Sequence, residues 1–159
     1  MVTPALMLAL VLGGSADDLM TARYGALTLQ VPAVWKHSVQ EGSHKYLAPS
    51  GEAFFLLDVG RVATPPMDPG ACRKKILDNM GGDTGWQMLS IGAAPAARKL
   101  DLDVTPDKKD QVQTYTFVGC DGTTTWSLVF HLDSKKKDRF APLAERVAKS
   151  VLYVHPERK

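Results

Sequence analysis

The segment Gln111–Leu132 reads QVQTYTFVGCDGTTTWSLVFHL and carries the clearest structural signal in the chain. Its Asp121-Gly122 pair stands between two runs rich in β-branched and aromatic residues, which is a strong signature of a β-hairpin. In the second run every second residue is large and apolar: Trp126, Leu128, Phe130 and Leu132. Because successive side chains of a strand point to opposite faces, one face of this hairpin is predicted to be core. The two strands predicted are Gln111–Cys120 and Thr124–Leu132.

Further strands are predicted before this hairpin. Ala53–Val62 (AFFLLDVGRV) is the most apolar stretch after residue 16 and is typical of a central strand. Glu41-Gly42 lies between two short strands, and its glycine suits a hairpin turn. The other strands predicted by these patterns are Tyr24–Val31, Lys36–Gln40, Ser43–Leu47, Trp86–Ile91 and Arg98–Val104.

Two helices are predicted. Ala71–Met80 places an apolar residue at every fourth position and is followed by the helix-stopping pair Gly81-Gly82. Arg139–Val151 has the apolar spacing of a buried helical stripe, with Asp138 as the expected N-cap and Pro142 expected in the first turn. The predicted fold class is therefore α+β: a mainly antiparallel sheet of about six to eight strands covered by two amphipathic helices.

The first residues predict export. Ala5–Leu12 (ALMLALVL) is an unbroken apolar run, followed by the small residues of Gly13–Ala16 and then by charged Asp17. An apolar core followed by small residues is the pattern of a signal peptide, here residues 1–16, which leaves one domain at 17–159. The run is much shorter than the about 20 residues that cross a membrane, so no membrane-spanning segment is expected. We expect a periplasmic or secreted protein, and a buried N-terminal strand or helix is the alternative.

The two cysteines agree with an oxidising compartment. Cys72 and Cys120 are the only cysteines in the sequence, an even number in a chain that reads as exported. A disulfide between them is expected to stabilise the fold by about 4 kcal/mol, because it closes a long loop. Two buried free thiols are the alternative interpretation.

The charge of the chain excludes one class of partner and suggests a surface for another. A net charge of +2 is too small to indicate nucleic-acid binding. The basic residues Lys135, Lys136, Lys137 and Arg139 are the one charged cluster of interest. They are predicted either to form a positive patch for an acidic protein, anionic lipid or cell-wall polymer, or to be an ordinary solvated loop.

Reactive constellations are scarce. If Glu41-Gly42 forms a two-residue turn, His37 and His44 lie diagonally on one face of a hairpin, where they could hold a metal. No further ligand has a suitable spacing, so we predict no metal site and no cofactor. Cys120 and His131 lie on paired strands but far apart along them, which excludes a Cys–His nucleophile. No catalytic residue is assigned.

The order of the elements resembles PsbP-like domains. Val31–Trp35 (VPAVW) is similar to the turn that follows the first strand of this superfamily, and the ending FAPLAERVAKSV is similar to its last helix. The resemblance covers most of residues 23–154 and implies a three-layer α/β/α sandwich. It also implies a protein that acts by binding other proteins, as do the known relatives in photosynthesis, nuclear transport and the bacterial envelope.

Together these features predict a non-enzymatic, exported protein-binding or chaperone-like domain of the cell envelope. Its partner is expected to be another envelope or secreted protein, bound at the part of the sheet that the helices leave uncovered. Aromatic residues are favoured at interface centres, so Trp35, Tyr46 and Trp86 are the predicted anchors. The alternative functions are a small-ligand carrier, or a metal-binding protein or enzyme that uses His37 and His44.

Overall fold

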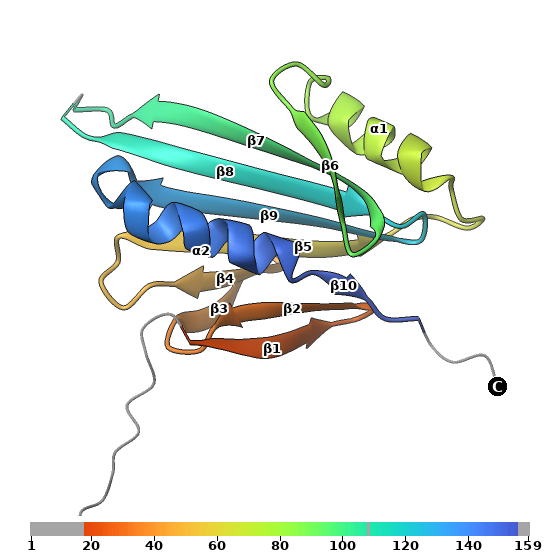
Figure 1. The fold of residues 1–159 in the computed structure, drawn as a ribbon, viewed down its shortest axis with the longest axis horizontal. Coiled ribbons are helices and arrows are strands. Elements are labelled where there is room, and N and C mark those ends of the chain that lie inside the picture. The colour runs from red at the N-terminus through yellow and green to blue at the C-terminus, as the bar shows by residue number, and fades with distance from the viewer. Residues whose placement is uncertain (1–17, 108, 156–159) are drawn as a thin grey trace, which may run out of the picture.

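The predicted hairpin lies at the centre of a seven-stranded antiparallel sheet, here called the large sheet. In the computed structural model, which describes residues 18–107 and 109–155, Cys120 pairs with Thr125 across the Asp121-Gly122 turn. Figure 1 shows the strands side by side. Their order is β3 (Lys36–Gln40), β4 (Ser43–Leu47), β5 (Ala53–Arg61), β9 (Thr124–Asp133), β8 (Gln111–Cys120), β7 (Ala94–Val104) and β6 (Gln87–Ile91).

A second, small sheet lies beside the large one. It consists of β1 (Leu19–Tyr24), β2 (Leu27–Pro32) and the short β10 (Leu152–Tyr153), in the order β1-β2-β10. The prediction of one strand from Tyr24 to Val31 was therefore wrong at its beginning. Gly25 has a φ of 59°, a conformation that glycine adopts readily, and it turns the chain between β1 and β2.

One face of the large sheet forms the main core. The apolar residues that alternate along β5 and β9 point to this face, where Phe55 and Phe130 are completely buried. The helix α2 (Lys137–Lys149) covers it and buries Phe140, Leu143, Ala144, Val147 and Ala148. The small sheet adds Leu27, Leu29 and Val31 to the same core. The apolar faces of the strands and the apolar stripe of α2 therefore pack together in one cluster.

The helix α1 (Pro69–Asn79) lies on the opposite face. Its Leu77 packs against Ala97 and Val118, whereas the neighbouring residues Ala96 and Phe117 belong to the main core. Consecutive residues of a strand point to opposite faces, so the two helices cover opposite faces of the sheet. The predicted α/β/α arrangement is confirmed for the described residues, which contain these two α-helices and the two antiparallel sheets.

The two helices begin differently. The carboxylate of Asp68 accepts a hydrogen bond from the backbone nitrogen of Ala71 at 2.9 Å, and Pro69 is the first residue of α1. The start predicted for the last helix was wrong. A short 3₁₀ turn, Ser134–Lys136, comes first and is capped by Asp133, so α2 begins at Lys137 and Pro142 lies beyond its first turn.

A disulfide joins α1 to the large sheet. The sulfur atoms of Cys72 and Cys120 are bonded, as the sequence suggested, and both residues are almost completely buried. The bond links the helix to the end of β8, beside the turn of the central hairpin. The predicted signal peptide, residues 1–16, lies outside the described residues. No helix among the residues described here is long and apolar enough to span a bilayer.

Candidate functional site

Two of the predicted aromatic anchors belong to the core. Trp35 is 7% exposed and packs at the edges of Phe130 and Phe140. Tyr46 is 2% exposed and stacks on Phe55. Their assignment to an exposed interaction surface was therefore wrong. Trp35 lies in the turn between β2 and β3 and Tyr46 on β4, and both side chains belong to the main core. Large aromatic side chains are equally favoured in a core and at an interface.

Trp86, the third predicted anchor, has a different environment. It is half-buried and packs against the small cluster of Leu77, Ala97 and Val118 between α1 and the sheet. It therefore lies on the face that α1 covers, with part of its surface in solvent. Trp86 remains a candidate contact residue.

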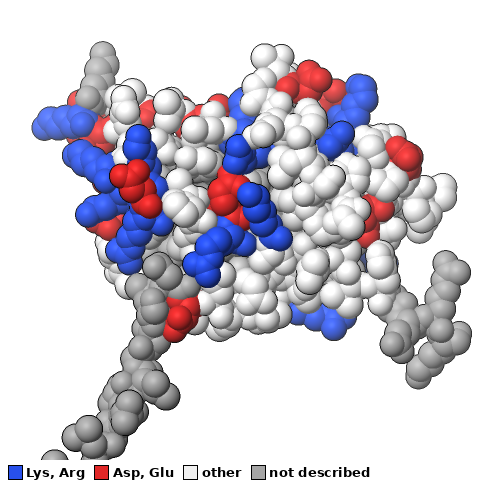
Figure 2. All heavy atoms as spheres, in the orientation of Figure 1, with Lys and Arg blue, Asp and Glu red and all other residues white. Residues whose placement is uncertain are grey.

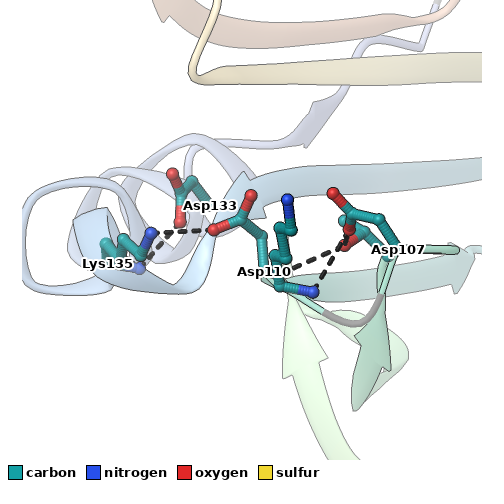
Figure 3. Close-up of polar contacts among 6 residues, drawn as sticks. Asp107, Asp110, Asp133 and Lys135 are labelled. Atoms are coloured by element: carbon teal, nitrogen blue, oxygen red, sulfur yellow. Dashed lines mark hydrogen bonds and ion pairs between the residues drawn. The ribbon is translucent and has the colours of Figure 1, made fainter.

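Two lysines of the basic segment that follows β9 lie beside carboxylates. Lys135 donates a hydrogen bond to Asp110 at 2.7 Å, and this bond and the charge of Asp110 raise the pKa of Lys135 (Figure 3). Lys136 lies 3.9 Å from the carboxylate of Glu52. Figure 2 shows acidic and basic side chains interspersed at this end of the molecule. The segment does not form a uniform positive patch, although Lys137 and Arg139 are exposed.

The face of the large sheet that carries α1 is covered at only one end. The helix packs on β7 and β8 near the disulfide, whereas no helix of the described residues packs on the part formed by β4, β5 and β9. Half-buried apolar side chains point outward from that part: Leu47, Phe54, Leu56 and Val129. We call these four residues, together with His131 and Lys45, the open face.

The open face is ordered by contacts between neighbouring strands. The rings of Phe54 and His131 stack with their centroids 4.7 Å apart, and the ammonium group of Lys45 lies 4.7 Å from the centre of the Phe54 ring. Thr114 is 3.1 Å from Nδ1 of His131, within hydrogen-bond distance. Stacking and cation–π contacts hold these side chains in defined positions. Phe54 and His131, at least, therefore have little side-chain freedom left to lose on binding.

The predicted pairing of the two histidines is confirmed. Glu41 and Gly42 both have positive φ and form a two-residue turn. This turn pairs His37 with Tyr46 and Val39 with His44. Nε2 of His37 lies 3.1 Å from Nδ1 of His44. A tyrosine that the sequence analysis did not consider, Tyr24 of β1, stacks on the ring of His44 at 3.9 Å. Its hydroxyl lies 3.3 Å from Nε2 of His37 and also contacts the hydroxyl of Tyr46.

The surroundings of two members of this cluster, His44 and Tyr46, favour their neutral forms. Burial, followed by the charge of His37, lowers the pKa of His44, and the charge of Asp58 acts in the opposite direction. Burial, followed by the hydrogen bond with Tyr24, raises the pKa of Tyr46. We call Tyr24, His37, His44 and Tyr46 the histidine cluster. It joins the end of β1 to the β3–β4 hairpin.

Other reactive groups are not brought together. His131 pairs with Thr114, and Cys120 pairs with Thr125 near the other end of the hairpin, in agreement with the separation expected from the sequence. Within the part of the chain that the structure describes, no group of three or more His, Cys, Asp or Glu side chains could hold a metal.

The stability of the fold is expected to fall as the pH drops below about 6.5. Burial lowers the pKa of both His44 and His131 from the ordinary value of 6.5. The unfolded chain therefore binds protons before the folded chain does, and the stability present above pH 6.5 is lost as the pH falls through the folded pKa values. Denaturant midpoints measured from about pH 7.5 to about pH 5.5 test this. The double variant His44→Gln, His131→Gln should show a weaker dependence over this range, and equal slopes would contradict the assignment.

Comparison with known proteins rests on structure alone. Neither a protein-family model nor a curated protein sequence matches the chain. A structure from Bacteroides thetaiotaomicron matches 84% of this chain at 13% identity with a TM-score of 0.67, and this chain spans 47% of that structure's length. A mutant form of Mog1 matches 86% of this chain and 96% of its own, at 14% identity and a TM-score of 0.54.

A third structure is LpqN of Mycobacterium tuberculosis, which is described as involved in cell envelope biogenesis. It matches 87% of this chain and 91% of its own, at 14% identity and a TM-score of 0.55. With the sheet order and the two helices, these likenesses confirm that the chain has the Mog1/PsbP-like fold. At such low identity they define the fold and leave the function to be argued from the surface.

Proposed function

We propose that this chain is a non-enzymatic protein-binding or chaperone-like domain of the cell envelope or the secreted fraction. Three observations support the proposal. The chain begins with a sequence that resembles a signal peptide, and its two cysteines are joined in a disulfide, which is typical of oxidising compartments. One protein of the same fold, LpqN, is described as acting in cell envelope biogenesis. The partner would be another envelope or secreted protein.

The open face is the proposed binding surface, and it is the observation that carries the proposal. An outward-facing group of apolar side chains on a sheet has no partner within the described chain, although the other face of the same strands is fully packed. Contiguous apolar surface of this kind marks interaction sites on soluble proteins. Phe54 and Val129 would lie at the centre of the interface, since they project from the two adjacent strands β5 and β9.

Charged groups surround this apolar centre. Lys45 lies beside Leu56 on one side, and Lys99 and Asp101 of β7 lie beyond the threonines of β8 on the other. A dry centre with a polar rim is the usual anatomy of a protein interface. Trp86, which is on the same side of the sheet, is proposed as a contact at the rim. Lys137 and Arg139, exposed on α2 on the opposite side of the sheet, are proposed as contacts outside the open face. Rim charges would affect the rate of association more than the affinity.

Site-specific photo-crosslinking in the producing cell tests this function. A photo-reactive phenylalanine analogue placed at Val129 should form a covalent adduct with one discrete partner, because that side chain points outward from the open face. The matched control carries the analogue at Lys75, which is exposed on α1 on the same side of the sheet. The variant Val129→Glu should lose the co-purifying partner, since a carboxylate in a dry interface is costly.

Adducts of equal intensity at both positions, or none at either, would contradict the proposed surface. Turnover of a small substrate by the purified protein would contradict the non-enzymatic assignment. The alternative function, a small-ligand carrier, predicts a bound compound of defined mass in native mass spectrometry and no effect of Val129→Glu on that compound.

A further inference from the structure

The strand β7 has a free edge over part of its length. β6 begins at Gln87, which pairs with Arg98, so β6 accompanies β7 only from Ala94 to Arg98. On its other side β7 stays paired with β8 as far as Val104, and Figure 1 shows it extending beyond β6. Among the strands that the structure describes, none lies on the outer side of residues 99–104. We call residues 99–104 the free edge.

The backbone of the free edge offers hydrogen-bonding groups at every second residue. Opposite residues of an antiparallel pair alternate between those that bond to each other and those whose N–H and C=O groups point away. The backbone nitrogen of Thr105 donates to the carbonyl oxygen of Asp110 at 2.8 Å, which fixes this alternation between β7 and β8. Leu100, Leu102 and Val104 therefore direct their N–H and C=O groups away from β8. An added strand would bind there by main-chain hydrogen bonds.

The side chains of the free edge are patterned as well. Three apolar side chains, which are 47%, 61% and 56% exposed, point to the face of the sheet that carries α2: Leu100, Leu102 and Val104. They follow the buried Ala96 of the main core at intervals of two residues, which keeps them on its side of the sheet. Asp101 and Asp103 alternate with them on the other side. An added strand would therefore meet apolar groups on one face and carboxylates on the other.

The two carboxylates determine which kind of strand fits. Side chains directly opposite each other on paired strands attract when their charges differ and repel when they are alike. Lys99 lies 3.5 Å from Asp101 and offsets one of the two negative charges. A second copy of this chain, paired symmetrically about Leu102, would set Asp101 against Asp103. Charges on an edge thus exclude some partners and select others.

We propose that the free edge binds an extended segment of another polypeptide in which apolar and basic residues alternate. The apolar residues of that segment would pack beside Leu100 and Leu102 on the α2 side, and its basic residues would face Asp101 and Asp103. This surface is not the open face, which lies on the α1 side and is centred on other strands. The two share only the rim residues Lys99 and Asp101, so the inference does not depend on a partner at the open face.

Fluorescence anisotropy with a labelled peptide in which valine and lysine alternate tests the free edge. The disulfide-bonded protein should bind this peptide, and Leu102→Pro should weaken binding by about ten-fold, because proline lacks the N–H that would reach it. Proline removes no bond to β8 at this outward-facing position, and the denaturant midpoint of the variant establishes that it is folded. The double variant Asp101→Asn, Asp103→Asn should weaken binding by about five-fold at low salt. Val129→Glu, on the open face, is the matched control and should bind as the wild type does.

Hydrogen exchange of individual amides in the wild type distinguishes strand addition from other contacts. The peptide should slow exchange at Leu100, Leu102 and Val104, with little change at Asp101 and Asp103, whose amides already bond to β8. Absence of binding by the wild type, unchanged affinity in Leu102→Pro, or equal binding of a peptide in which valine and glutamate alternate would overturn the proposal. Self-association of the wild type that Leu102→Pro abolishes would also overturn it, because the free edge would then bind a second copy.

Discussion

Replacing Phe130 with alanine is expected to lower the free energy of unfolding by about 3–5 kcal/mol. The Phe130 ring is completely buried, and its centroid lies 4.6 Å from the centroid of the Phe55 ring. It also makes an edge-to-face contact with Trp35. Truncation removes these contacts and leaves a cavity between β9 and α2, where the packed helix and sheet can collapse only partly. Denaturant unfolding followed by circular dichroism measures the difference.

Val129→Ala is the matched control for this change. Val129 is the preceding residue of the same strand, but its side chain points to the open face and is half-buried. The variant should lose less than about 1 kcal/mol, because the smaller loss of buried area leaves no cavity. Similar losses for the two variants would contradict the assignment of opposite faces to the core and to solvent.

Removal of the disulfide is expected to cost about 4 kcal/mol. Cys72 and Cys120 are separated by 48 residues, and in the chain-entropy model a cross-link over this separation restricts the unfolded chain by that amount. The bond also holds α1 on the sheet, where the helix packs against only a small apolar cluster. Unfolding of the wild type should therefore shift to lower denaturant concentration when a reductant is added.

The double variant Cys72→Ala, Cys120→Ala provides the control. It should unfold near the midpoint of the reduced wild type and should not respond to reductant. Alkylation of the exported protein without reductant, followed by intact-mass measurement, should find no modified thiol. Two modified thiols, or a wild type that is indifferent to reductant, would show that the bond is absent from the mature protein.

The strands that the sequence predicted well are those with strong local signals. The Glu41-Gly42 turn sets the register of its hairpin, and the observed pair Val39–His44 follows from it. The Asp121-Gly122 signal located the central hairpin but not its register: it placed Cys120 near Thr123 or Thr124, whereas Cys120 pairs with Thr125. Missed elements had weaker signals. The strand β1, which precedes Gly25, was not predicted. The strand β7 begins at Ala94 because Gly92 and Ala93, both with positive φ, make a tight turn. An alanine in the sequence does not indicate such a turn.

The surface was harder to predict than the strands. Trp35 and Tyr46 were expected to be exposed anchors, yet they are core residues. A large aromatic residue in a turn or a strand suits a core as well as an interface, so its presence does not indicate which one it joins. The basic run was visible in the sequence. The approach of Asp110 and Glu52 to two of its lysines was not, because these carboxylates come from distant loops that only the folded chain brings near.

By itself, the sequence determined the central hairpin, the antiparallel class of the sheet, the two covering helices and the pairing of His37 with Tyr46. These follow from periodicity and turn chemistry, which are local properties of the chain. Only the tertiary structure decided which face of β5 and β9 stays uncovered and that Tyr24 reaches the two histidines. Both depend on where α1, α2 and β1 dock. Docking is governed by the summed packing of side chains far apart in sequence, which no single segment encodes.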